Sequence, residues 1–470
     1  MKLFLSLLTL LFLMPTSAQA FCGFYVAKAD ASLFNEASKV VLARHDDRTV
    51  MTMANDFKGD TKDFAIVIPV PTTIKKSQVN IGDSKIIDHL DAYTAPRLVE
   101  YFDNDPCQKR YRREMMMNAA PMAMADSAIS SKSSAKSLGV TIEESYTVGE
   151  YDILILSAKQ SDGLQTWLNQ EGYKLPKAAN KVLKSYIKQD MKFFVAKVNL
   201  KKFEKTGFTY LRPLQVAYES PKFMLPVRLG TLNSKGPQDL LLFTLTKNGR
   251  VEPTNYRTTK IPTGQDIPLF VENEFGEFYK AMFDTAVKKE KMKTVMLEYA
   301  WDMAWCDPCA ADPIPREDLR KMGVWWLDKG YEQPPGVPVP MPRQNQSQIA
   351  PRRIIMPQGG PVNAFVTRMH VRYTAESFPE DIMLQTTDDR KNFQGRYVLR
   401  HPFKGKAQCE AAGSYYDGLK TRFEKEAKTL ANLTGWDIND IRRKMEKNGQ
   451  SFNIKEAIQN EPWWEDMWNK

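Results

Sequence analysis

Apolar and polar residues alternate in three runs near the start of the chain. These runs are rich in β-branched residues, and charged turns separate them; they cover residues 39–43, 49–54 and 63–70. A period of two is typical of half-buried strands, so we expect an antiparallel meander here.

The period then changes to that of a helix. Ser84 is a residue type that begins helices, and three apolar residues after it, Ile86, Ile87 and Leu90, fall on one helical face. Pro96 is favourable in a first helical turn, so it predicts a second short helix that runs to Phe102.

Residues 139–300 mix the two periods. Strand patterns occur at 151–158, 193–199, 214–218, 224–229, 240–246 and 294–301. Helical faces are formed by Leu164, Trp167 and Leu168, by Val182, Leu183, Tyr186 and Ile187, and by Phe275, Phe278, Tyr279, Met282 and Phe283.

The C-terminal third continues with strands and then helices. Strands are predicted at 365–373, 382–385 and 396–399, and a helical stripe follows at Leu419, Phe423, Ala427 and Leu430. Asp437 is an N-cap for a last helix that runs to Glu446, and Gly449 ends it. We expect the final tryptophans, Trp463, Trp464 and Trp468, to plug a core; a partner surface or an interfacial anchor is the alternative.

Together these patterns predict an α+β protein with mostly antiparallel, β-rich units, packed helices and a helical C-terminal tail. The predicted segments are a signal peptide at 1–20, an N-terminal α+β unit at 21–113, a linker or loop rich in Met and Ser at 114–138, a central α+β unit at 139–330, a Pro-rich connection at 331–362, C-terminal strands at 363–405 and the helical tail at 406–470.

The N-terminus has the pattern of a secretory signal. Lys2 precedes an apolar run of about a dozen residues, which is too short to span a bilayer. The A-x-A sequence at 18–20 predicts cleavage after Ala20, and Cys22 is one position too late to be a lipidated first residue. No later apolar run reaches the length of a transmembrane helix, so we expect a periplasmic product.

The formal net charge of +10 indicates which partners the protein could bind. A basic surface in the cell envelope suits anionic headgroups or polymers, and nucleic acid is not expected outside the cytoplasm. The expected partner is an unknown envelope protein or an anionic envelope component. The densest basic cluster is Lys109-Arg110 with Arg112-Arg113.

The linker at 114–138 contains five methionines without an apolar period, at positions 115, 116, 117, 122 and 124. This composition predicts a flexible connection. A soft-metal site for Cu(I) is the alternative, because thioether sulfur suits that ion.

Trp305-Cys306-Asp307-Pro308-Cys309 is the one run that matches a known chemical motif. A C-x-x-C pair at the start of a helix is typical of thiol–disulfide oxidoreductases, in which Cys306 would attack and Cys309 would resolve. The prolines at 313 and 315 delay any helix here. A structural disulfide is therefore the preferred interpretation.

Other chemistries have little support. His401 and Cys409 would complete a zinc site only together with the C-x-x-C pair. The sequence has four histidines and contains neither a hydrolase motif nor a dinucleotide or phosphate loop. We therefore expect no catalytic residue, no metal and no cofactor.

Five stretches carry a resemblance to a bacterial exported family of unknown function, domain of unknown function 2330. They are Cys22-Gly23-Phe24, the run 63–71, the run 218–223, the run 306–309 and the run 394–402. The resemblance implies an envelope protein and supplies no catalytic residue.

Five cysteines in an exported chain allow two bridges. We expect Cys306–Cys309 as one and Cys22–Cys107 as the other, which leaves Cys409 unpaired. The function expected from the sequence is a non-enzymatic binding or scaffold role in the envelope. A periplasmic thiol–disulfide oxidoreductase and a copper binder are the alternatives.

Overall fold

The computed structural model of the chain describes residues 24–27, 38–55, 64–108, 140–158, 161–170, 179–199, 202, 211–233, 236–305, 307, 312–328, 362–405 and 407–452. The signal peptide, the Met-rich linker, the Pro-rich connection up to residue 361 and the terminal tryptophans fall outside these residues. Cys22, Cys306 and Cys309 also fall outside them.

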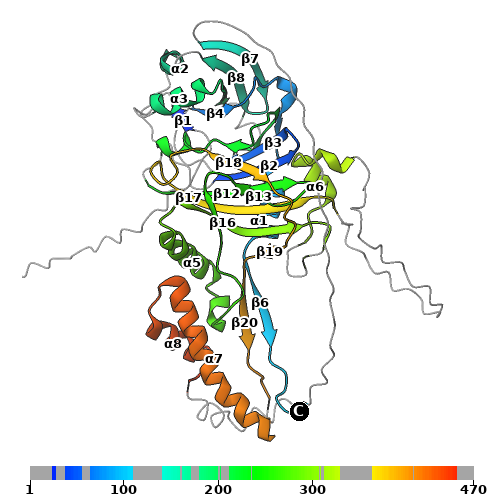
Figure 1. The fold of residues 1–470 in the computed structure, drawn as a ribbon, viewed down its shortest axis with the longest axis vertical. Coiled ribbons are helices and arrows are strands. Elements are labelled where there is room, and N and C mark those ends of the chain that lie inside the picture. Colours follow the sequence, from blue (N-terminus) through cyan, green and yellow to red (C-terminus); the bar gives the residue numbers. More distant parts are fainter. Residues whose placement is uncertain are drawn as a thin grey trace, which may run out of the picture.

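Two antiparallel-rich sheets form the upper part of the molecule (Figure 1). The five-stranded sheet has the order β1-β4-β9-β8-β7. Its strands are β1 (Phe24–Ala27), β4 (Phe64–Val70), β9 (Lys192–Val198), β8 (Tyr151–Ala158) and β7 (Val140–Val148).

The second sheet has nine strands in the order β14-β16-β17-β12-β2-β3-β10-β5, with β19 beside β16. Its strands are β14 (Arg257–Lys260), β16 (Thr294–Asp302), β17 (Phe365–Tyr373), β12 (Gln238–Thr246), β2 (Ser38–His45), β3 (Arg48–Asn55), β10 (Leu214–Glu219), β5 (Val79–Ile81) and β19 (Phe393–Gln394). Strands from the N-terminal unit, the central unit and the C-terminal strand segment therefore share this one sheet.

Helices cover the outer faces of both sheets. The helices α2 (Ser161–Gln170) and α3 (Ala179–Lys188) cover the five-stranded sheet. The other sheet is covered by α1 (Ser84–Thr94), α5 (Phe275–Lys289), α6 (Arg316–Lys321) and η4 (Trp325–Asp328). The result is a layered arrangement of helices, sheet, sheet and helices.

Strand alternation explains these layers. In β2, Val40 and Leu42 enter the core between the two sheets, whereas Val41 and Ala43 pack under α1. Because β2 is buried on both faces, its sequence shows a nearly continuous apolar run instead of an alternation.

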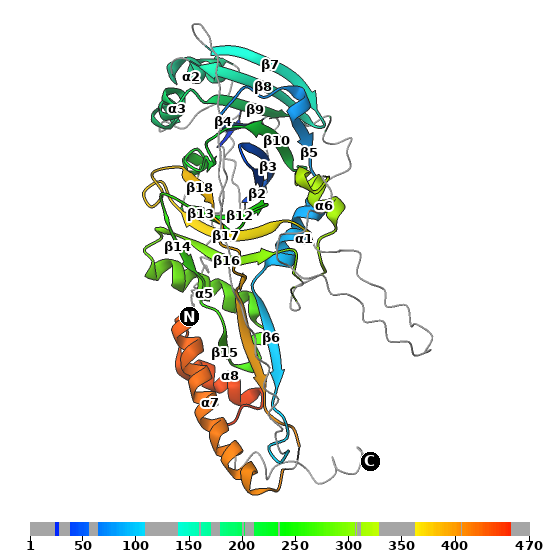
Figure 2. The same ribbon diagram turned by 45° about the vertical axis from the view of Figure 1, so that its right-hand side comes forward.

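An arm extends from the sheets to the far end of the molecule (Figure 2). It is a parallel three-stranded sheet in the order β15-β20-β6, formed by β15 (Gln265–Ile267), β20 (Arg396–His401) and β6 (Arg97–Phe102). The helices α7 (Glu410–Thr434) and α8 (Ile438–Lys447) and the short helix η3 (Leu269–Glu272) pack on it.

The remaining elements are short. A three-stranded sheet contains β11 (Met224–Leu225), β18 (Ile382–Thr386) and β13 (Val251–Pro253). Two 3-10 turns, η1 (Lys76–Gln78) and η2 (Gly230–Asn233), complete the described elements.

The α+β prediction is confirmed, and most predicted elements lie within a residue or two of their positions. Two predictions were wrong: residues 97–102 form strand β6, not a helix, and the third run of the expected meander forms β4, which pairs with β1 and β9 in the five-stranded sheet rather than with β3. Residues 97–102 pair with β20 at all six positions, so tertiary pairing overrides the proline signal. The cap of α1 is Asp83, whose carboxylate accepts from the Lys85 amide, rather than Ser84.

No helix in the described ranges is long and apolar enough to cross a membrane.

Candidate functional site

The C-x-x-C sequence follows β16 in the chain, and one of its residues, Asp307, is a buried carboxylate. Asp307 is only 7% exposed. Its Oδ2 accepts hydrogen bonds from the Tyr299 hydroxyl at 2.9 Å and from the Gln394 amide at 2.8 Å. Asp307, one of the two residues between the cysteines, is thus anchored by β16 and β19.

The neighbouring aromatic residues fix the entry to this turn. The indole of Trp301 donates to the Trp305 carbonyl at 3.0 Å, and Trp305 itself is 57% exposed. Burial raises the pKa of Tyr299 above its usual range, with smaller contributions from Tyr93 and Asp307. Tyr299 therefore stays a neutral donor to Asp307.

A thioredoxin-type site requires a helix that begins at the first cysteine. Asp307 is not helical, and the next helix that the structure describes, α6, begins at Arg316. The positions of Cys306 and Cys309 lie outside the described residues.

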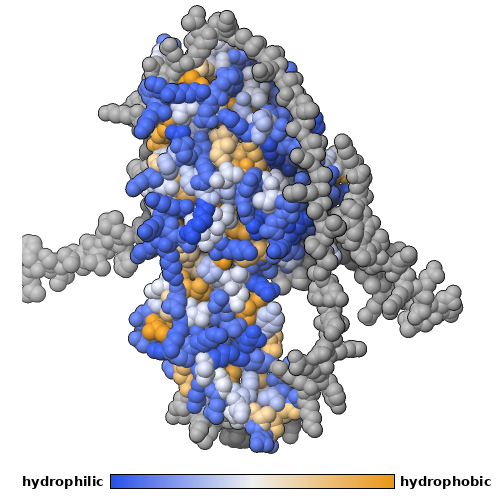
Figure 3. All heavy atoms as spheres, in the orientation of Figure 1, coloured by the Kyte–Doolittle hydropathy of each residue, from blue (hydrophilic) through white to orange (hydrophobic). Residues whose placement is uncertain are grey.

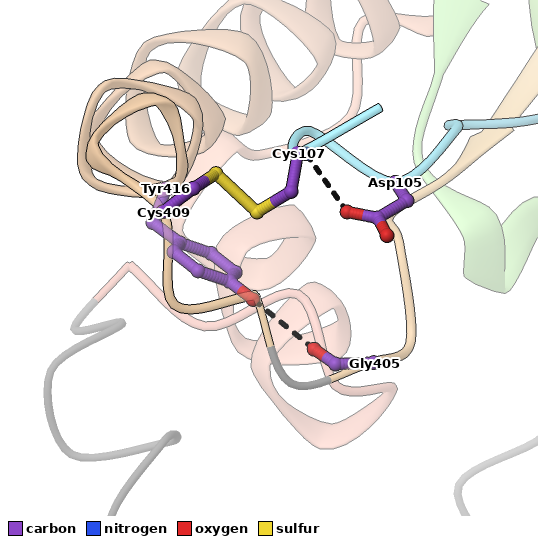
Figure 4. The surroundings of a disulfide bond; sticks show 5 residues. All are labelled: Asp105, Cys107, Gly405, Cys409 and Tyr416. Atoms are coloured by element: carbon purple, nitrogen blue, oxygen red, sulfur yellow. Dashed lines mark hydrogen bonds between the residues drawn. A yellow bond between two sulfur atoms is a disulfide. The ribbon is translucent and has the colours of Figure 1, made fainter. Parts of the chain in front are cut away.

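A disulfide bond closes the tip of the arm (Figure 4). It joins Cys107 to Cys409, with the two Cα atoms 5.7 Å apart. Cys409 is the N-cap residue of α7, and the Cys107 amide is held by Asp105 Oδ1 at 2.8 Å. Both cysteines are exposed at the surface.

The predicted bridge between Cys22 and Cys107 was therefore wrong, as was the prediction that Cys409 is unpaired. The reason is the parallel pairing of β6 with β20, which places Phe102 beside His401. Each cysteine follows a few residues after its strand, so the two meet at the same end of the arm. Only the strand character of residues 97–102 would have indicated this pairing.

The zinc alternative loses two of its ligands. Cys409 is bonded to Cys107, and His401 Nε2 is 2.9 Å from Glu100 Oε2 while its ring stacks on Phe102. In the part of the chain that the structure describes, no three His, Cys, Asp or Glu side chains are grouped as metal ligands.

A network of ionised side chains lies between the sheet and its covering helices. Strand β17 contributes Arg368, His370 and Arg372, whose side chains share one face. Arg368 donates to Glu298 on β16 and to Asp91 on α1. Arg372 donates to Asp239 on β12 and to Asp284 on α5.

His370 lies at the centre of this network. Its Nδ1 is 2.8 Å from Glu298 Oε1, its Nε2 is 3.7 Å from Asp239 Oδ1, and its ring stacks on Phe283. Burial lowers the pKa of His370, but Glu298 and Asp239 outweigh that effect and raise it. Both ring nitrogens face carboxylates, which favours the protonated form of His370.

The carboxylates respond in the opposite sense. Burial would raise the pKa of Glu298, yet Arg368 and His370 lower it to about 2. The same balance, with His370 and Arg372, lowers the pKa of Asp239 to about 2. The network therefore stays ionised at neutral pH, and it links α1 and α5 to strands β12, β16 and β17.

The sequence prediction missed this network. An Arg-x-His-x-Arg alternation at 368–372 in an otherwise apolar strand was its only visible signal. Such a pattern indicates one polar face and does not identify the partners.

Comparison with known proteins gives one match. A family described as "Uncharacterized protein conserved in bacteria (DUF2330)" matches residues 16–385. The chain belongs to this family. No curated protein and no solved structure matches.

The match to the family covers most of the layered body and stops within β18. The ion network from Asp91 to Arg372 lies inside the matched range. Strand β20, helices α7 and α8, and Cys409 lie beyond it. The disulfide therefore joins a cysteine inside the range matched by the family to one outside it.

Proposed function

We propose that the chain is an exported protein of the bacterial cell envelope, released from its signal peptide after Ala20, that acts by binding rather than by catalysis. The observation that supports export is the Cys107–Cys409 bond. Both cysteines are exposed, and exposed structural disulfides persist in oxidising compartments such as the bacterial periplasm.

A binding role without catalysis is supported by the pairing of the buried charged side chains. The buried charges of the network are committed to each other, and His370 is held between two carboxylates. Hydrophilic side chains cover most of the face seen in Figure 3. The expected partner is an envelope protein or an anionic envelope component, in keeping with the net charge of +10.

Thiol trapping in cells tests export. The full chain and a version that starts at Phe21 are expressed side by side, cells are quenched in acid, and free thiols are labelled with a maleimide polymer. Cys107 and Cys409 should be protected in the full chain and labelled in the version without the signal. Cys107→Ser is the matched control, because it should expose Cys409 to labelling in the full chain.

Labelling of both cysteines in the full chain would contradict the proposal.

A separate assay addresses the redox alternative: the purified chain should not reduce insulin. Insulin reduction that disappears in Cys306→Ser would replace the binding role with a thiol–disulfide oxidoreductase.

A further inference from the structure

Two neighbouring parallel strands, β2 and β12, end at the same edge in the middle of the nine-stranded sheet. Arg44 near the end of β2 lies opposite Thr246 at the end of β12. From there, β2 turns back into β3, whereas β12 leads to β13 in a different sheet. Chains that leave parallel neighbours in different directions open a crevice beyond the carboxyl ends, which is where open sheets bind ligands.

A hollow of about 360 Å³ lies at this point. Its walls come from the β2–β3 turn, the loop after β10, the turn after β12, and β18. The residues that line it are Arg44, His45, Asp46, Asp47, Pro221, Phe223, Thr246, Lys247, Asn248, Leu384, Gln385 and Thr386. Its volume is in the range of small-molecule sites, which begins at about 300 Å³.

Arg44 is the buried cation of this hollow, and its side chain is 8% exposed. Its guanidinium donates to Thr49 Oγ1 at 2.9 Å and to the Ser220 carbonyl at 3.1 and 3.2 Å, and it lies over the Phe223 ring. One carboxylate reaches it, Asp47 at 3.4 Å, and that side chain is 67% exposed. Burial lowers the pKa of Arg44, and Tyr218, Asp47 and Asp46 offset this only in part.

Arg368 provides an internal comparison. It is equally buried, but two carboxylates, Glu298 and Asp91, bond directly to it, and together they raise its pKa despite burial. A buried charge is costly unless it is paired. Arg44 is therefore a buried cation whose one carboxylate partner, Asp47, is largely exposed, and it lines a hollow.

The other charges around the hollow limit what would fit. Lys247 adds a second cation, whereas Asp46 and Asp47 on the turn place two carboxylates beside Arg44. A polyanion would be repelled by these carboxylates. A ligand with one carboxylate and one ammonium group satisfies both sets of charges.

We propose that this hollow binds a small zwitterion, an α-amino acid or a short peptide. Its carboxylate lies on Arg44 and Lys247, its ammonium group faces Asp46 and Asp47, and its apolar part contacts Phe223 and Leu384. The inference gives a ligand class to the binding role proposed above. Export and thiol state are measured separately, so either proposal can fail alone.

Thermal unfolding of the purified mature chain with an equimolar mixture of the twenty amino acids, and then with dipeptides, tests the site. Amino acids or dipeptides that raise the unfolding temperature are followed by calorimetric titration. Three further probes are tested in parallel: sodium acetate, inorganic phosphate and the methyl esters of the binding compounds. The esters keep the ammonium group but lose the carboxylate. Amino acids or dipeptides should bind, and esters and phosphate should not.

Arg44→Gln should weaken binding about 10- to 100-fold, as expected for loss of a charged hydrogen bond. Arg48→Gln is the matched control, because Arg48 begins β3 directly after the turn, is exposed, pairs with Glu219 and does not line the hollow. It should leave the affinity unchanged. If Arg44→Gln does not fold, Thr386→Trp decides, since Thr386 is exposed and a tryptophan there fills the hollow.

Three results would overturn the inference. The first is no response to any amino acid or dipeptide. The second is binding of phosphate or esters that equals or replaces binding of the zwitterions. The third is wild-type affinity in Arg44→Gln or in Thr386→Trp.

Discussion

Two buried glutamates show how neighbouring groups set the charge of one type of side chain. Glu298 contacts Arg368 and His370, which lower its pKa to about 2. Glu426 on α7 is 1% exposed, and its hydrogen-bond partner is the neutral amide of Gln450 at 2.7 Å. Burial raises the pKa of Glu426 to about 7, because Arg422, 3.6 Å away, and Arg400 on β20 compensate only in part, and Asp266 on β15 opposes them.

Glu426→Gln should stabilise the protein at alkaline pH. The folded-state pKa lies above the ordinary value of 4.5, so the folded protein retains a proton that the unfolded chain loses between pH 4.5 and about 7. Stability from this group is thus complete below pH 4.5, falls through that window, and stays low above pH 7. Because the folded-state pKa is about 7 and the ordinary value is 4.5, the gain above pH 7 has an upper limit of about 3 kcal/mol.

Urea unfolding from pH 4 to 8.5 measures this effect. Glu424→Gln is the control on the same helix: Arg442 lowers the pKa of Glu424, so this variant should give no gain at high pH. Equal stability of wild type and Glu426→Gln at pH 8.5 would show that Glu426 is not buried as described.

Asp307 gives a second prediction for a single residue. Asp307→Ala leaves the Tyr299 hydroxyl and the Gln394 amide without their acceptor, and each unsatisfied buried group costs about 1–3 kcal/mol. The unfolding free energy should fall by about 2–6 kcal/mol, the sum for the two groups. Trp305→Ala, at an exposed neighbouring position, should change it by less than about 0.5 kcal/mol. Similar losses in the two variants would contradict the anchoring role of Asp307.

At the level of elements, the arm depends on a single covalent link. The Cys107–Cys409 bond spans a sequence separation of 302 residues and joins the end of β6 to the start of α7. In the chain-entropy model, a loop of this length is worth about 6 kcal/mol as an upper limit. Cys107→Ser should lower the unfolding midpoint and increase amide hydrogen exchange in β6 and the first turns of α7.

The effect of the disulfide alone is measured by comparing the wild-type protein with and without a reductant. Reduction should reproduce the effect of Cys107→Ser and have no further effect on that variant. Unchanged exchange in β6 after reduction would mean that the arm does not need the bond.

Strands and helices could be predicted well where burial follows a simple period. Strand β17 was predicted with its observed bounds, because its residues are apolar and β-branched on the buried face. Residues 97–102 could not be predicted, because Pro96 favours a helix start and the strand exists only through its pairing with β20. That pairing brings together segments about 300 residues apart, and no local pattern encodes it.

At the scale of the whole molecule, the ion network around His370 was missed for the same reason: local sequence patterns do not encode which strands are neighbours. Arg368 and Glu298 were both visible in the sequence, but their partnership depends on β16 and β17 being neighbours. The hollow at Arg44 depends on β2 and β12 being parallel, although β12 follows β2 by about two hundred residues. Sequence patterns indicate which faces are buried, and the order of strands decides which charges meet.

The proposed function makes one claim about the whole molecule, that the chain is exported and processed. Intact-mass measurement of the chain recovered by osmotic shock from its bacterial host tests this claim most directly. We predict a periplasmic product that begins at Phe21 and gains two mass units on reduction of Cys107–Cys409, with two more for any further disulfide. A product that stays in the cytoplasm and retains residues 1–20 would contradict the account.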